Sequence, residues 1–288
     1  MTTLAGPSPR ASSLRAMATL AYTELTAGPN PPERWVLFLH GLLGRGGNWR
    51  SFGRRWVETY PTWGAGLVDL RLHGDSSTGF SPPHSVRAAA QDVLELLPAL
   101  PGPVEAVVGH SLGGKVVLAL QRASGQRIPR AVVLDASPSP RPDAVGSEQT
   151  RDILTLLAQL PREYRTRAEF VAAAEAGGQP RSIAQWLAMA LQPSDGKMVL
   201  DLDLAGFESL YASVLAEDDW DVVTSVPAGH RLAFIVGGAS ATVDPEARER
   251  IAALAPRVTL EEIPGAGHWV HVDAPEATFG AVERALTT

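Results

Sequence analysis

The chain has no cysteine, no long hydrophobic run and no strong charge of one sign. Without cysteine there is no disulfide, no thiol nucleophile and no thiolate metal site, while the redox compartment stays undecided. No apolar stretch is long enough to cross a bilayer, so we expect no membrane insertion. The 25 Lys and Arg against 31 Asp and Glu give a net charge of −6. Nucleic acid favours a basic face, so we expect no nucleic-acid partner.

The first sixteen residues lack the apolar core of a signal peptide. We interpret residues 1–17 as a flexible leader, with Met17 as an alternative start, and we expect a cytoplasmic protein. The composition is otherwise that of an ordinary soluble protein, with 45% hydrophobic and 19% charged residues among 288. A chain of this length is ample for one large domain with a single core.

A strand-turn-helix pattern surrounds Ser111. The apolar run 104–108 precedes Gly109-His110-Ser111-Leu112-Gly113, and a helix-like run follows from Lys115. This is the pattern of a nucleophile elbow, in which the serine occupies a strained turn and its neighbours need almost no side chain. The sequence therefore predicts that Ser111 is an exposed nucleophile at the carboxyl edge of a sheet.

A second motif, His40-Gly41-Leu42-Leu43-Gly44, follows the strand-like run 35–39. It resembles the H-G-x-x-G loop of alpha/beta-hydrolase esterases. That resemblance implies that the backbone amides of Leu42 and Leu112 form an oxyanion hole. Such donors are held in place before the reaction begins and stabilise the oxyanion as it forms.

Near the end of the chain, Gly265-Ala266-Gly267-His268-Trp269 follows the strand-like run 258–263. A histidine at this place resembles the family's catalytic base, and imidazole has a suitable pKa for taking the proton of a serine hydroxyl. We assign the base to His268. Of the other candidates, His110 lies within the elbow motif, His40 belongs to the oxyanion loop, and His73 lies in a loop that in this family usually shapes the fold. The pocket candidates are His40, Trp49, Trp186, Trp269 and His271.

The acid that orients His268 departs from the commonest pattern. In that pattern an Asp follows the penultimate strand, but here Ser240 occupies the expected position. Asp244 lies nearby, yet Asp244 followed by Pro245 is typical of a helix start. Asp135 ends the strand-like run 131–134 beside the elbow and is our preferred acid, with Asp244 and cap acids such as Asp203 as alternatives.

Together these motifs resemble one subgroup of the alpha/beta-hydrolase superfamily, the bacterial esterases related to mitochondrial alpha/beta-hydrolase-domain proteins. The resemblance implies an α/β fold with a mostly parallel eight-stranded sheet flanked by helices, and a helical cap inserted after the sixth strand. We expect the core at residues 18–137 and 227–288, and the cap at residues 138–226. Helix-like segments in the cap cover 148–160, 166–176, 182–191 and 204–215.

The predicted function is hydrolysis of short to medium acyl esters by a serine enzyme through an acyl-enzyme. No cofactor or metal is implied, and the expected partner is a small-molecule ester. Three alternatives stay open: cofactor-free perhydrolase or haloperoxidase chemistry, a lyase of the menaquinone-pathway type, and a non-catalytic binding protein. The sequence leaves the oligomeric state open between monomer and homodimer.

Overall fold

The computed structural model describes residues 18–287, and the predicted leader at 1–17, Met17 included, lies outside the described residues. In the described part of the chain a seven-stranded sheet has the order β1-β3-β2-β4-β5-β9-β10, and β1 alone runs antiparallel to its neighbour. The strands are β1 (Tyr22–Leu25), β2 (Arg34–Leu39), β3 (Trp63–Val68), β4 (Val104–His110), β5 (Arg130–Leu134), β9 (Arg231–Gly237) and β10 (Val258–Ile263).

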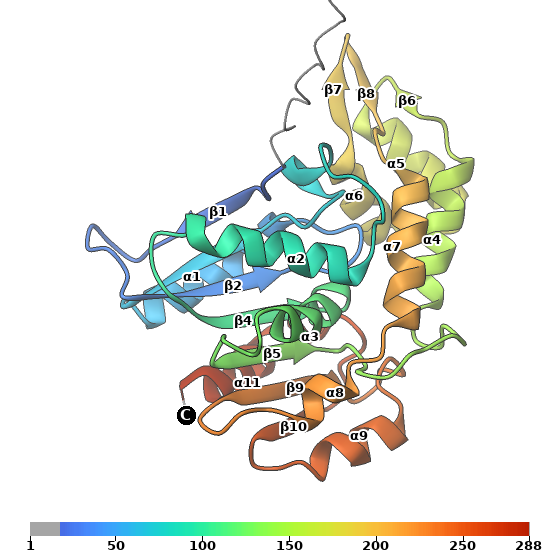
Figure 1. Cartoon of the computed structure of the whole chain (residues 1–288). Coiled ribbons are helices and arrows are strands. Elements are labelled where there is room, and N and C mark those ends of the chain that lie inside the picture. Colours follow the sequence, from blue (N-terminus) through green and yellow to red (C-terminus); the bar gives the residue numbers. More distant parts are fainter. Residues whose placement is uncertain (1–17, 288) are drawn as a thin grey trace, which may run out of the picture.

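The sheet is covered on both faces, which explains why its inner strands are continuous runs of Val, Leu, Ile and Ala. Helices α2 (Val86–Leu96), α3 (Leu112–Ala123), α8 (Trp220–Thr224) and α9 (Pro245–Ala252) share one core with the sheet. Helices α1 (Arg50–Thr59), α10 (Val270–Asp273) and α11 (Pro275–Thr287) share the second core. Figure 1 shows the sheet between these two helical layers. The structure confirms the predicted fold class.

Two details of that prediction were wrong, and both have one cause. The described chain has seven strands in its main sheet instead of eight, and the insertion follows the fifth strand instead of the sixth. Five strands of the main sheet precede the insertion and two follow it, so the sheet has one strand fewer than predicted before the insertion. All later strands therefore move down by one in the count.

The insertion between β5 and β9 carries the helices α4 (Glu148–Gln159), α5 (Arg167–Ala176), α6 (Arg181–Leu187) and α7 (Leu204–Ala216). They match the predicted helical segments closely. Thr166 caps α5, since its hydroxyl accepts a hydrogen bond from the Glu169 amide. Helices α4, α5 and α6 share a hydrophobic core of their own, whereas Phe207 and Leu210 of α7 belong to the core that the sheet shares with α2 and α3. Figure 1 shows these helices beside the main sheet. They form a layer distinct from the two that cover the sheet.

A small antiparallel sheet within this insertion was not predicted. Its strands are β6 (Glu163–Tyr164), β8 (Lys197–Val199) and β7 (Gln192–Ser194). β7 and β8 form a hairpin whose turn residues, Asp195 and Gly196, have φ of 48° and 75°. An Asp-Gly pair between short strands is the usual signal for such a turn. The signal was therefore present, although the flanking strands are mostly exposed and lack an apolar alternation.

Short 3₁₀ helices complete the description: η1 (Gly46–Trp49), η2 (Gly74–Ser76), η3 (Leu97–Ala99) and η4 (Ala188–Ala190). Between residues 18 and 287, no helix has both the length and the apolar character that crossing a membrane requires.

Candidate active site

Ser111 lies in the sharp turn between β4 and α3. Its backbone has φ 54° and ψ −115°, a region that a residue with a Cβ rarely adopts. The turn is held by the Ser111 amide, which donates to the Leu134 carbonyl oxygen on β5 at 3.0 Å, and by the Lys115 amide, which donates to the Ser111 carbonyl at 3.1 Å. Strain of this kind persists only where the surroundings fix it, and it is common at functional sites.

Two glycines make the turn sterically feasible. A Cβ on Gly109 would lie 2.2 Å from the Gly113 carbonyl oxygen, and a Cβ on Gly113 would lie 2.3 Å from the Leu39 carbonyl oxygen. Both contacts are with backbone atoms that cannot rotate away. The close approach of β2, β4 and α3 at this point therefore requires glycine at both positions.

The His268 ring reaches Ser111 from the loop after β10. Its Nε2 lies 3.0 Å from Ser111 Oγ, and its Nδ1 lies 2.7 Å from Asp135 Oδ2. With the Nδ1 proton donated to the carboxylate, Nε2 is left as an acceptor for the serine hydroxyl. The geometry thus brings together a hydroxyl, a base and an acid from three segments far apart in sequence.

Asp135 follows β5 directly and is fully buried, at 0% exposure, with φ 46°. A buried carboxylate needs partners, and this one has three. Its Oδ1 accepts from the Gly237 amide at 2.9 Å, while its Oδ2 accepts from the Ser240 hydroxyl at 2.6 Å and from His268 Nδ1. These contacts aim the carboxylate at the imidazole.

The two alternative acids, Asp244 and Asp203, cap helices and do not contact His268. Asp244 caps α9 by accepting from the Ala247 amide at 2.9 Å, and Asp203 caps α7 by accepting from the Gly206 amide at 2.9 Å. Among the described residues, the carboxylate that contacts His268 is Asp135. The position after the penultimate strand instead supplies Ser240 as a hydroxyl donor to Asp135.

Thr242 is a contact of His268 that sequence reasoning missed. Its Oγ1 lies 3.1 Å from His268 Nδ1 and 3.1 Å from Ser240 Oγ. Two hydroxyl side chains two residues apart, after a buried strand, were the available signal. That signal is common in loops, so it does not by itself indicate a site.

The loop His40–Gly44 lies beside the turn that carries Ser111: a Cβ on Gly41 would lie 3.5 Å from Ser111 Cβ. The loop closes on itself through the Gly44 amide, which donates to the Gly41 carbonyl at 3.0 Å. Leu112 is the first residue of α3, where an amide has no acceptor within the helix. The amides of Leu42 and Leu112 thus belong to two segments that meet next to Ser111.

Two buried histidines brace this loop. His40 Nε2 accepts from the Leu70 amide and His73 Nε2 accepts from the Leu43 amide, each at 3.0 Å. Each Nδ1 donates to a backbone carbonyl, which leaves both rings neutral donors and acceptors. Burial lowers the pKa of His40 to about 4 and that of His73 to about 3. His40 therefore acts mainly as a brace, although one edge of it borders a cavity.

His110 connects the elbow with the loop that carries His268. Its Nε2 donates to the His268 carbonyl oxygen at 2.9 Å, and its ring packs 4.8 Å from the His268 ring and 4.7 Å from the His271 ring. Burial and the neighbouring imidazoles hold the pKa of His110 well below its usual range. The ring is thus a neutral spacer that fixes the distance between the two segments.

All five predicted pocket residues line one cavity of about 660 Å³, which lies between α1, α6 and the segment 269–279. Those residues are His40, Trp49, Trp186, Trp269 and His271. Trp49 stacks on His271 at 4.6 Å, and burial lowers the pKa of His271 to about 4. The cavity reaches Gly41 and His110, which adjoin Ser111, whereas Ser111 itself borders a separate hollow of about 30 Å³.

Among residues 18–287, no group of three or more His, Asp or Glu side chains has an arrangement that could hold a metal ion. The expected lack of a metal or cofactor stays a prediction.

Comparison with known proteins adds three findings. The model of the "Alpha/beta hydrolase family" matches residues 36–281. The chain is 30% identical over 272 residues to "sn-1-specific diacylglycerol lipase ABHD11" of Mus musculus, covering 91% of this chain and 83% of that protein. It is 27% identical over 257 residues to "Esterase YbfF" of Escherichia coli (strain K12), covering 87% of this chain and 92% of that protein.

Among solved structures, a "Marine microorganism esterase" superposes with a TM-score of 0.79 at 21% identity, covering 93% of this chain and 99% of that chain. At this identity the likeness concerns the fold alone.

Proposed function

The chain belongs to the alpha/beta hydrolase family, and we propose that it is a serine carboxylic-ester hydrolase that works through an acyl-enzyme. The observation that carries this proposal is the position of the His268 ring between Ser111 Oγ and the Asp135 carboxylate, at 3.0 and 2.7 Å. The names of the relatives, an esterase and a lipase, support the same class of reaction.

In the proposed first step, Ser111 Oγ attacks the ester carbonyl carbon while its proton passes to His268 Nε2. The carbonyl bond electrons move onto the oxygen. As the intermediate collapses, the bond to the alcohol oxygen breaks and Nε2 returns the proton to that oxygen. Asp135 keeps the ring in the productive tautomer and stabilises the imidazolium.

In the second step a water attacks the acyl carbon and gives a proton to His268 Nε2. The bond to Ser111 Oγ breaks, the serine regains the proton, and a carboxylic acid leaves. The amides of Leu42 and Leu112 donate to the oxyanion in both steps, and each such donor typically lowers the barrier by roughly 3 kcal/mol.

We assign the substrate pocket to the cavity of about 660 Å³, because it adjoins the serine through Gly41 and His110. Its volume lies in the usual range for small-molecule sites and suits short to medium acyl esters. We propose that the insertion at residues 138–226 acts as a cap, since Trp186 of α6 forms part of the cavity wall and packs against Trp269. Cytoplasmic localisation and the absence of nucleic-acid partners stay predictions.

The test compares the wild-type protein with Ser111→Ala. We expect the wild type to hydrolyse p-nitrophenyl acyl esters and to label with a fluorophosphonate, and the variant to lose roughly 10⁶-fold in turnover and all labelling. Circular dichroism should be unchanged. Near wild-type turnover by Ser111→Ala would overturn the nucleophile assignment.

The same experiment separates the alternatives. Labelling without turnover of any ester in the series would favour a lyase or peroxidation reaction on the same residues. A wild-type protein that neither labels nor hydrolyses would favour a binding protein.

A further inference from the structure

Two chain segments connect the insertion to the core and lie side by side. The chain leaves the core at residues 138–141, called the outgoing crossing, and returns at residues 215–220, called the returning crossing. The Asp219 amide donates to the Pro138 carbonyl at 2.9 Å, and the Arg141 amide donates to the Leu215 carbonyl at 2.7 Å. The Trp220 indole also donates to the Ser139 hydroxyl at 2.9 Å. The two crossings therefore form one paired base beneath the insertion.

Lys115 binds both crossings from α3. Its ammonium donates to the Ser139 carbonyl at 3.2 Å on the outgoing crossing, to the Glu217 carbonyl at 2.7 Å and to the Asp219 carboxylate at 3.3 Å on the returning one. The side chain is 4% exposed. An ammonium has three hydrogens, so these three acceptors use all of its donor capacity.

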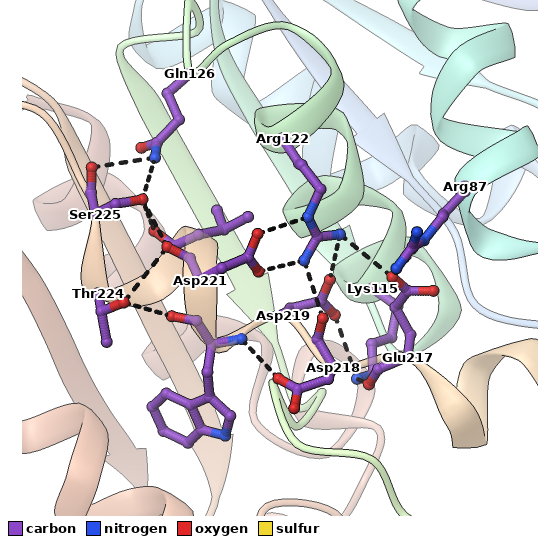
Figure 2. A network of polar contacts seen from close by, with 12 residues as sticks. Arg87, Lys115, Arg122, Gln126, Glu217, Asp218, Asp219, Asp221, Thr224 and Ser225 are labelled. Carbon is purple, nitrogen blue, oxygen red and sulfur yellow. Dashed lines mark hydrogen bonds and ion pairs between the residues drawn. The ribbon is translucent and has the colours of Figure 1, made fainter.

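Arginines surround this lysine and hold the returning crossing from outside. Arg122, on the same helix, reaches Asp219, Glu217 and Asp221, while Arg87 of α2 reaches Glu217 (Figure 2). Asp219 itself is 0% exposed and lies between Lys115 and Arg122. The acidic segment 217–221 is thus fixed to the core by cations from two helices.

The choice of lysine at this place is informative. The chain has 23 arginines and 2 lysines, the other being Lys197. A compact ammonium on a flexible stem fits three converging oxygens, whereas a planar guanidinium does not. Burying an ion pair is a poor way to add stability, because desolvation offsets the attraction, and fixing geometry is the better-attested use.

The geometry that Lys115 fixes includes a small hollow beside Ser111. Lys115 lies one helical turn after Ser111, and both border the small hollow of about 30 Å³. The insertion side of this hollow is formed by Arg141, Val145, Val214 and Leu215, which lie at or next to the two crossings. A shift of the base relative to α3 would change the space at the serine directly.

We propose that Lys115 is a positioning residue that sets the distance between the serine-bearing helix and the insertion, and thereby determines which acyl esters fit at Ser111. This inference rests on the proposed esterase function. Lys115 takes no part in proton transfer, because its ammonium is turned to the crossings and all its hydrogens are engaged.

The test measures kcat and KM for p-nitrophenyl esters from acetyl to octanoyl with Lys115→Met, which keeps an unbranched side chain one atom shorter and removes the charge. We expect kcat for the acetyl ester to stay within about threefold, because the Ser111–His268–Asp135 contacts are untouched. KM should change with chain length, so that the ratio of kcat/KM between octanoyl and acetyl esters shifts at least tenfold. The control is Lys197→Met, which removes the other lysine, exposed on β8 and far along the insertion.

Asp219→Asn keeps the shape of the base while removing the charge of one acceptor, and it serves if Lys115→Met does not fold. We expect the same direction of shift, at least threefold. An unchanged ratio in a folded variant, or an equal fall in kcat for every ester, would overturn the positioning role. Absent turnover and labelling in the wild type would instead mean that the proposed esterase function has failed.

Discussion

At the scale of single residues, the site depends on which carboxylate orients the imidazole. Asp135 accepts from His268 Nδ1 at 2.7 Å, whereas Asp244 accepts from the Ala247 amide as a helix cap. Asp135→Asn should favour the wrong imidazole tautomer, and we expect turnover to fall roughly 10⁴-fold. Asp244→Asn should change turnover less than about threefold, since Asn caps helices about as well as Asp.

Steady-state kinetics on p-nitrophenyl acetate, with melting temperatures for both variants, checks this prediction. If Asp244→Asn were the crippled variant, the role of Asp135 would be structural.

A residue-scale pH prediction concerns His40 and His73, the two histidines that brace the loop at residues 40–44. Burial lowers the pKa of His40 to about 4 and of His73 to about 3. Both should therefore stay neutral at pH 5, where a histidine in the unfolded chain, with a pKa of about 6.5, is mostly charged. In proton NMR, the ring Cε1 signals of His40 and His73 should not titrate between pH 7 and 5. The variants His40→Gln and His73→Gln assign the two signals. Titration of either signal near pH 6.5 would contradict the prediction.

The residues with the strongest sequence signals were the easiest to place. Ser111 and His268 belong to motifs in which glycines and neighbouring strands limit the conformation, and Asp135 follows a strand that pairs with the serine strand. Ser240 shows what could not be predicted. Its hydroxyl donates to Asp135 across 105 positions of sequence, and no local pattern reveals such a contact.

At the scale of elements, the elbow requires β4 and α3 to meet β2 with no side chain between them. A Cβ on Gly113 would lie 2.3 Å from the Leu39 carbonyl oxygen, so Gly113→Ala should force the backbones apart. We expect a loss of about 3 kcal/mol in unfolding free energy, together with loss of turnover. Gly47→Ala is the matched control, because its Cβ would have no neighbour nearer than 3.9 Å.

Urea denaturation of both variants gives the comparison. An equal stability of Gly113→Ala and Gly47→Ala would contradict the close packing.

Helices were predicted better than strands at this scale. The helices of the insertion carry amphipathic runs and capping residues, and α4, α5 and α7 lie within one or two residues of the expected ranges. The strands β6, β7 and β8 have two or three residues each, too few for a periodicity. Their pairing depends on contacts between segments far apart, such as Tyr164 with Met198.

At the scale of the whole molecule, the sequence could indicate an insertion but not what fastens it. The Lys115 and Arg122 contacts span 95 to 104 positions and join an ordinary-looking helix to an acidic segment. The stability of the whole chain should depend on pH through Asp219 of this network and through the buried histidines. As the pH falls, their contributions to the unfolding free energy change in opposite directions.

The histidine contribution is clear in sign. Burial lowers the pKa of His40, His73, His110 and His271 below the unfolded value, so their contribution is full above about pH 6.5 and is lost as pH falls. We expect the unfolding free energy to fall by more than 1 kcal/mol between pH 6.5 and 5. Urea denaturation at these two pH values measures it. Equal stability at both would contradict neutral buried histidines.

Asp219 works against this trend. Burial is the largest influence on Asp219 and raises its pKa to about 6, although Lys115 and Arg122 oppose the rise. A raised folded pKa means a contribution that is present below about pH 4 and lost as pH rises to about 6. Asp219→Asn removes this opposing term, so its stability should fall more steeply on acidification from pH 6 to 4 than that of the wild type. The difference in slope should be at most about 1.4 kcal/mol per pH unit, the value for one proton.

Asp221→Asn provides the control for this slope. Arg122 lowers the pKa of Asp221, so the contribution of Asp221 is lost only below the pH window in which Asp219 titrates. Urea denaturation at pH 4.5, 5.2 and 6.0 should therefore give parallel lines for Asp221→Asn and the wild type, and a steeper line for Asp219→Asn. A line for Asp219→Asn parallel to the wild type would mean that Asp219 is already charged throughout this range, and that the buried base of the insertion holds a full ion pair at acidic pH.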